Sequence, residues 1–114
     1  MPSESLPSVR VFFPTLDTEG VVAALKANLG ALQHRLPVKL VVLFGSYAKG
    51  NYTVASDIDV LVVYAGDHRE DAYAAAKRAL ALPRLEPHVY SEAEYEQARE
   101  TVDRMMVGGI QVFP

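Results

Sequence analysis

Hydrophobic and polar residues alternate along the first half of the chain in a pattern that predicts one helix followed by two strands. Apolar residues recur every three or four positions, which predicts a helix that begins at Asp17 or Thr18 and stops at Pro37. Residues 38–44 form an apolar run that is too short for a buried helix and is typical of a strand covered on both faces. Residues 59–64 repeat this pattern and predict a second strand. The helical stripe consists of Val21, Val22, Leu25, Leu29, Leu32 and Leu36.

The second half of the chain predicts a helix, a strand and a further helix. Residues 69–82 are rich in alanine and other strong helix formers and end before a proline, which predicts a second long helix. Residues 85–90 predict a third strand, in which Pro87 has no N–H to donate and therefore indicates an edge or a bulge. The spacing of Ser91 and Glu94 is that of a capping box, so we expect a helix from there to about residue 106.

Both ends of the chain leave alternatives open. Residues 1–14 carry three prolines around the apolar stretch 9–13, which is either an edge strand or a docked arm. Gly108 and Gly109 end the last predicted helix. In the tail, residues 107–114, the segment 110–113 is either a short last strand or a hydrophobic segment that docks on the sheet or on another subunit of a homo-oligomer. No internal repeat divides the chain, so we expect residues 1–114 to form a single domain.

Composition narrows the possible functions. A chain of 114 residues, half of them hydrophobic, forms one modest core and leaves no room for a separate substrate domain. The net charge is −3 and no Lys/Arg cluster resembles a nucleic-acid footprint, so broad nucleic-acid binding is not expected. The absence of cysteine excludes disulfides, thiolate nucleophiles and Cys-based zinc sites. Without an apolar run of about 18 residues or a signal peptide, we expect a cytoplasmic protein and no membrane partner.

The candidate chemistry lies in the pattern Gly45-Ser46, ten residues, Asp57-Ile58-Asp59. Alternate residues of a strand share a face, so Asp57 and Asp59 direct their carboxylates to one point, and paired oxygen ligands suit a magnesium-like ion. The Gly45-Ser46 turn follows a strand and precedes a short helix, a setting that binds phosphate. Each motif alone is usually an ordinary turn or a solvated pair of aspartates. Together they indicate metal-assisted phosphoryl transfer.

This combination resembles the signature of the polymerase-beta-type nucleotidyltransferase superfamily, in particular its minimal nucleotidyltransferase branch. The resemblance covers roughly residues 38–90. It implies an α/β fold with a mixed sheet of about four to five strands, helices mainly on one face, and an acidic site at one end of the sheet. Gly45 and Ser46 match the pair that grips the nucleotide phosphates, and Asp57 and Asp59 match the carboxylates that bind two Mg²⁺ ions.

Two further positions match the family less well. Glu86 stands where the family usually has a third catalytic and metal-binding aspartate, and its longer side chain either points to the metals or lies solvated at the sheet edge. Lys49 matches a position that commonly carries a basic, nucleotide-binding residue, with a solvated lysine as the equal alternative. His88 alternates with Glu86 along the predicted strand, so it either shares the face of that residue or is simply a partly exposed sheet residue.

The resemblance also implies a reaction and a partner. The expected reaction is Mg²⁺-dependent transfer of AMP from ATP onto a hydroxyl of a helical protein of the HEPN class, which makes this chain an MntA-type antitoxin of a toxin-antitoxin pair. One alternative is a catalytically weak or inactive binding module that neutralises its partner through the segment 110–113 and the arm around Phe12 and Phe13. The other is a nucleotidyltransferase that acts on RNA or a small molecule.

Overall fold

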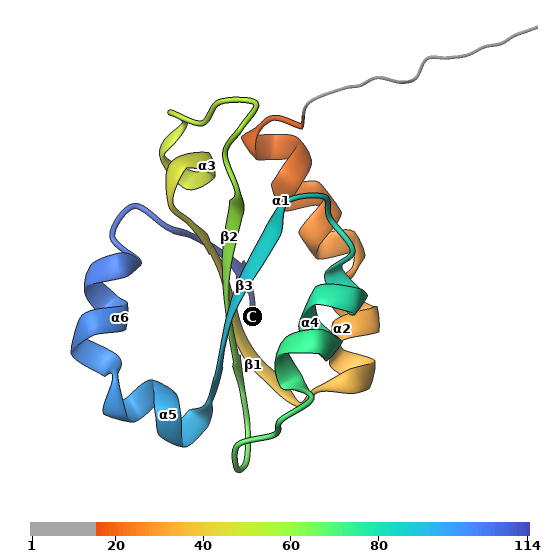
Figure 1. Ribbon diagram of the computed structural model, residues 1–114, viewed down its shortest axis with the longest axis vertical. Helices are drawn as coiled ribbons and strands as arrows, with labels where there is room; N and C mark the ends of the chain where they lie inside the picture. Colours follow the sequence, from red (N-terminus) through yellow and green to blue (C-terminus); the bar gives the residue numbers. More distant parts are fainter. Residues whose placement is uncertain (1–15) are drawn as a thin grey trace, which may run out of the picture.

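The computed structural model describes residues 16–114 and contains a four-stranded sheet with helices on both faces (Figure 1). The strand order is β3-β2-β1-β4. β1 pairs antiparallel with β2 and with β4, whereas β2 and β3 are parallel, so the sheet is mixed and the predicted α/β fold class is confirmed. The strands are β1 (Val38–Phe44), β2 (Ile58–Tyr64), β3 (Leu85–Ser91) and β4 (Ile110–Phe113). The predicted arm, residues 9–13, lies outside the described residues.

The helices form two unequal layers. One group of helices covers one face of the sheet, and a second group covers part of the other face (Figure 1). The first layer consists of α1 (Thr18–Ala27), α2 (Leu29–Arg35) and α4 (Ala72–Leu80), and the second of α5 (Glu92–Gln97) and α6 (Arg99–Met105). The short α3 (Ser46–Lys49) follows β1 at one end of the sheet. No helix within residues 16–114 is long and apolar enough to cross a bilayer.

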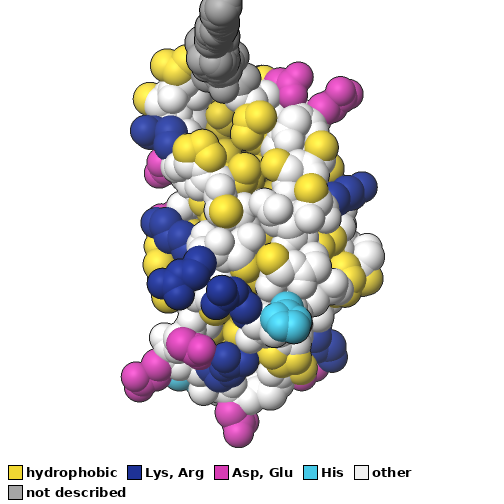
Figure 2. All heavy atoms as spheres, turned by 90° about the vertical axis from the view of Figure 1, so that its right-hand side faces the viewer, with side chains coloured by type: hydrophobic (Ala, Val, Ile, Leu, Met, Phe, Trp, Pro, Cys, Tyr) yellow, Lys and Arg dark blue, Asp and Glu magenta, His cyan; other side chains and the backbone are white. Residues whose placement is uncertain are grey.

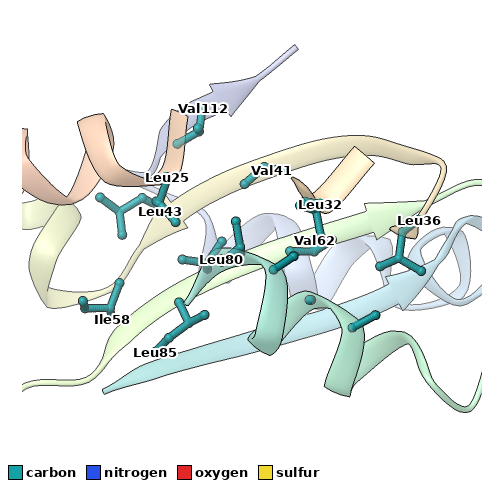
Figure 3. Packing of buried hydrophobic residues seen from close by; sticks show 14 of the residues in the cluster. Leu25, Leu32, Leu36, Val41, Leu43, Ile58, Val62, Leu80, Leu85 and Val112 are labelled. Atoms are coloured by element: carbon teal, nitrogen blue, oxygen red, sulfur yellow. The ribbon is translucent and has the colours of Figure 1, made fainter. Parts of the chain in front are cut away.

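Alternate residues of the strands pack into two separate cores. The larger core lies between the sheet and α1, α2 and α4, where Leu25 and Leu32 from the helices meet Val41 and Val62 from the strands (Figure 3). The smaller core lies on the opposite face under α6 and is formed by Val42, Phe44, Leu61, Val63 and Val102. The prediction that residues 38–44 are covered on both faces is therefore confirmed.

The first and the last predicted helix are each divided into two shorter helices, so the predictions of a single helix in each of these regions were wrong. Asn28 separates α1 from α2 with φ −100° and ψ 4°, and its side-chain amide donates to the Leu80 carbonyl at 2.8 Å. Ala98, with φ −101° and ψ 13°, separates α5 from α6. α4 is also shorter than predicted, because Ala81 takes a left-handed conformation with φ +56° and ends the helix at Leu80.

The predicted ends of several elements are confirmed. Asp17 caps α1 by accepting from the Gly20 backbone N–H at 2.7 Å. The capping box of Ser91 and Glu94 makes both of its hydrogen bonds at the start of α5. β3 is an edge strand, as Pro87 indicated, and the segment 110–113 forms the short last strand that was one of its two predicted forms.

Candidate active site

The strand registers bring the glycine turn and the acidic residues to the same end of the sheet. Phe44, the last residue of β1, pairs with Asp59 of β2, and Asp59 pairs in turn with Glu86 of β3. Paired residues of neighbouring strands point to the same face. Leu61, two residues after Asp59, lies in the smaller core, so these side chains belong to the face that carries α5 and α6.

Gly45 lies directly against the Asp59 carboxylate. A Cβ atom on Gly45 would be 2.7 Å from Oδ2 of Asp59, which is closer than atoms of this kind approach. The backbone of Gly45 also has φ +75°, a conformation that other residues rarely adopt. The backbone conformation is the stronger reason for glycine here, since the nearest atom belongs to a side chain that could shift, and the bare Cα also leaves room beside the acid.

The second oxygen of the same carboxylate faces His88. His88 Nε2 lies 3.3 Å from Oδ1 of Asp59, and the two side chains are 31% and 29% exposed. The edge of one ring meets the face of the other between His88 and Phe44, with the ring centroids 4.9 Å apart. His88 therefore lies on the face that Asp59 shares with its partner Glu86, as one prediction had it, and it is also partly exposed, as the alternative had it. The contact with Asp59 was not predicted.

Asp57 is more exposed and is held by an arginine from a distant turn. Its side chain is 61% exposed, and Arg84 Nη2 lies 3.5 Å from Oδ1 of Asp57. Arg84 also donates from Nε to the Ser56 carbonyl at 3.1 Å and from Nη2 to the Ala55 carbonyl. Arg84 has φ +60°, an uncommon conformation for a residue with a side chain. Nothing in the sequence pointed to this residue, because its partners are brought to it only by the pairing of β2 and β3.

The loop before Asp57 is stabilised from within by Ser56. Ser56 Oγ accepts from the Thr53 backbone N–H at 2.8 Å, and the Ser56 N–H donates to the Thr53 carbonyl at 3.1 Å. Serine side chains commonly form such local bonds to the backbone. Together with Arg84, this turn holds the backbone from which Asp57 projects.

Glu86 pairs with Asp59 through the backbone, but its carboxylate is directed elsewhere. Glu86 Oε1 lies 3.5 Å from the hydroxyl of Tyr73, a residue of α4 on the other side of the sheet. Because β3 is an edge strand, the long glutamate side chain can bend around the edge of the sheet. Within residues 16–114 no three side chains of His, Cys, Asp or Glu are grouped to hold a metal ion. The role of Glu86 as a third acid stays a prediction.

The residues present fit a magnesium ion bound largely by substrate and water. Carboxylate oxygens are hard donors, and Mg²⁺ is usually held by one or two carboxylates together with substrate phosphates and water molecules. Asp57 and Asp59 offer such a pair, with Asp57 open to solvent. The neighbouring Gly45 leaves the approach to Asp59 free of a side chain.

The remaining candidate residues lie on or beside α3. Ser46 is the first residue of α3, where backbone N–H groups have no partner within the helix. The Lys49 side chain lies along the turn between α6 and β4, with Cγ 3.7 Å from the position of a Cβ on Gly108. Tyr47 is buried and stacks on Tyr52 with ring centroids 4.3 Å apart, so the Tyr47 ring belongs to the core.

Comparison with known proteins identifies the class. The sequence model of the nucleotidyltransferase domain family matches residues 25–107, so the chain belongs to this family. A candidate protein adenylyltransferase of Methanocaldococcus jannaschii is 50% identical over 42 residues, which are 35% of this chain and 42% of that protein. The chain therefore matches less than half the length of this relative.

Solved structures share the fold. A candidate nucleotidyltransferase of Sulfolobus solfataricus aligns with a TM-score of 0.55 and 22% identity, over 82% of this chain and 80% of that one. A chain of a toxin-antitoxin crystallised with AMP-PNP aligns with a TM-score of 0.56 and 22% identity, over 77% of this chain and 72% of that one. A chain of a mutant of the toxin-antitoxin MntA-HpeT aligns with a TM-score of 0.52 and 20% identity, over 86% of this chain and 73% of that one.

Proposed function

We propose that this chain is a nucleotidyltransferase that moves AMP from ATP onto a hydroxyl of a protein partner. The proposal is supported above all by the closeness of Gly45 to the Asp59 carboxylate, because the turn expected to bind phosphate lies beside the carboxylate expected to bind a metal. A site of this kind can hold the phosphates of a nucleotide beside the group that stabilises their charge.

In the proposed reaction the acceptor hydroxyl attacks the α-phosphorus of ATP. The new bond joins the hydroxyl oxygen to phosphorus, the bond to the bridging oxygen breaks, and pyrophosphate leaves with the electron pair. Ser46 and the backbone N–H groups that begin α3 hold the departing phosphates, and Lys49 screens their charge. Asp57 and Asp59 would hold two Mg²⁺ ions, which neutralise phosphate charge when bound. Glu86 accepts the proton of the hydroxyl, provided that its carboxylate turns away from Tyr73.

A protein acceptor is supported by the relatives. The matching protein of Methanocaldococcus jannaschii is named as a candidate protein adenylyltransferase, and two of the similar structures are toxin-antitoxin chains. We infer that the acceptor is a helical HEPN-type toxin and that this chain is its antitoxin, working in the cytoplasm where ATP is available.

A labelling experiment tests the proposal. The chain is incubated with magnesium and ATP labelled at the α-phosphate in a lysate of the cells it comes from, and is compared with Asp59→Asn. A labelled protein band that requires the natural Asp59 supports transfer to a protein. Label found only in RNA or in a small molecule would contradict a protein acceptor and would favour RNA or a small molecule as the acceptor. No label from a folded chain contradicts the proposal and favours the binding module.

A further inference from the structure

We propose that His88 is a positioning residue that holds the Asp59 carboxylate in its metal-binding orientation, an inference that rests on the function proposed above. Oδ1 of Asp59 faces His88 Nε2 at 3.3 Å, while Oδ2 lies against the bare Cα of Gly45. The two oxygens are thus contacted from opposite sides, by the residue after β1 and by a residue of β3. Rotation of the carboxylate away from this position would break the contact with His88.

The His88 ring is itself held in place. It pairs through the backbone with Leu61, which is fully buried, and it meets the Phe44 ring at an angle of 64°. A ring that is only 31% exposed and packed in this way has few alternative rotamers. A hydrogen bond to an ionised acceptor is also stronger than one between neutral groups, by roughly a factor of two. His88 therefore presents its Nε2–H to Asp59 in one direction.

Such a contact matters because it acts on a metal ligand. Carboxylates that bind metals are usually hydrogen-bonded by a second residue, and removal of that residue typically lowers metal affinity about 10- to 100-fold. The acceptor in this contact is the carboxylate and the donor is the ring, so His88 orients Asp59 without taking part in the phosphate chemistry. Neither Gly45 nor Arg84 can replace it, since Gly45 offers no side chain and Arg84 contacts Asp57.

Two substitutions separate the hydrogen bond from the packing of the ring. His88→Phe keeps an aromatic ring against Phe44 but removes the donor, and His88→Gln keeps a donor near the position of Nε2. Mn²⁺ alone is titrated into each protein and the free ion is followed by electron paramagnetic resonance, with circular dichroism to confirm folding. We expect Mn²⁺ to bind His88→Phe about 10-fold or more weakly than the natural chain, and His88→Gln to remain close to it. Equal binding by His88→Phe, or equal weakening in both variants, would overturn the inference.

A second measurement needs neither metal nor activity. The imidazole nitrogen resonances of His88 are recorded by NMR in the metal-free natural chain and in Asp59→Ala. We expect a proton on Nε2 whose resonance moves when the carboxylate is removed, and an unchanged resonance would contradict the contact. If this signature and the Mn²⁺ difference are both present while no label is transferred from ATP, the proposed function fails and the positioning of Asp59 by His88 stands.

Discussion

At the scale of single residues, Gly45 offers the sharpest test of the site. In Gly45→Ala the new methyl group would displace the Asp59 carboxylate, which it would otherwise approach to 2.7 Å, and the residue would remain in an unfavourable backbone conformation. We expect a loss of about 1–3 kcal/mol in the free energy of unfolding and a loss of nucleotidyl transfer to the background. Urea unfolding and the labelling assay measure the two effects.

Gly50 provides a control for a positive φ in the same part of the chain. It has φ +81° and ψ 10°, a left-handed conformation that is less restrictive than the φ +75° and ψ −151° of Gly45, and nothing lies within 4 Å of the position of its Cβ. Gly50→Ala should therefore lose about 1 kcal/mol from backbone strain alone and should retain transfer. If both variants lose transfer equally, the contact between Gly45 and Asp59 is not what the activity depends on.

Glu86 yields a prediction because its side chain reaches Tyr73. An aspartate is one methylene shorter and would not bridge to α4, so in Glu86→Asp the carboxylate should stay on the face of Asp59. We expect Glu86→Asp to transfer AMP at least as fast as the natural chain, and Glu86→Gln to be slower by about 100-fold or more. Steady-state rates of labelling measure both.

Tyr73→Phe is the control for Glu86, since it removes only the hydroxyl at 3.5 Å. This hydrogen bond is long and exposed, so its loss should leave stability almost unchanged and should not slow transfer. A marked loss of activity in Tyr73→Phe would mean that the observed orientation of Glu86 is the working one, against the third-acid role.

The sequence could predict some of these residues but not others, for a physical reason. Gly45 and the two aspartates lie in a short motif that can be recognised from local spacing alone, and the structure shows that Gly45 lies beside Asp59. Arg84 and the contact of His88 depend on the register between β2 and β3, which no local pattern specifies. The bend of Glu86 around the edge of the sheet likewise depends on where Tyr73 lies.

At the scale of the elements, Asn28 joins three helices. Its amide donates to the Leu80 carbonyl at the end of α4 from the junction of α1 and α2. Asn28→Ala would leave that part-buried carbonyl without its partner, so we expect a loss of about 1–2 kcal/mol in the free energy of unfolding. Gln33→Ala, on the exposed surface of α2, should change it by less than about 0.5 kcal/mol. If both variants change the free energy of unfolding equally little, the hydrogen bond of Asn28 does not contribute to the stability of the fold.

The start of α5 predicts a dependence of stability on pH. The backbone N–H of Ser91 donates to the Glu94 carboxylate at 2.8 Å and is the main reason that the pKa of Glu94 lies below its ordinary value of 4.5, with His68 contributing further. A carboxylate whose pKa is lowered by folding stabilises the protein above its unfolded pKa, and this contribution is lost as the pH falls through the folded pKa.

We therefore expect Glu94→Gln to be less stable than the natural chain at neutral pH, with a gap that closes as the pH falls below 4.5. Urea unfolding of both proteins across that range measures the gap. Glu100→Gln, at a carboxylate that is 93% exposed, should show little gap at any pH. A Glu94 gap that is constant with pH would show that the carboxylate charge does not support the helix start.

The predictions of the helices and strands were correct where local signals determine an element, and they were wrong where contacts between distant residues determine it. The strands, the cap at Asp17 and the capping box at Ser91 follow from apolar runs and from side chains that bond to nearby backbone. The breaks at Asn28 and Ala98 have no such signal. The hydrogen bond of Asn28 reaches a residue 52 positions away, so the continuous apolar stripe could not reveal it.

At the scale of the whole molecule, basic residues lie on both sides of the sheet: Arg84 contacts Asp57, and Arg99 and Arg104 belong to α6. Asp59 faces the side of α5 and α6, and Lys and Arg side chains also gather over one flank of the face formed by α1, α2 and α4 (Figure 2). A shallow hollow of about 370 Å³ on α4 is lined by Tyr73, Ala74, Lys77 and Arg78.

The position of β4 changes how the binding-module alternative has to be tested. Deletion of residues 110–114 would remove a strand that pairs with β1 and would take the buried Val112 from the larger core. We expect the free energy of unfolding to fall by at least about 2 kcal/mol, as urea unfolding would show, so loss of partner control in the truncated chain would not reveal a docking surface. Gln111→Arg alters the exposed side of the same strand and should change stability by less than about 0.5 kcal/mol. Partner control that fails in Gln111→Arg while the free energy of unfolding is unchanged would therefore locate the docking surface on β4, because neither the acids nor the core has changed.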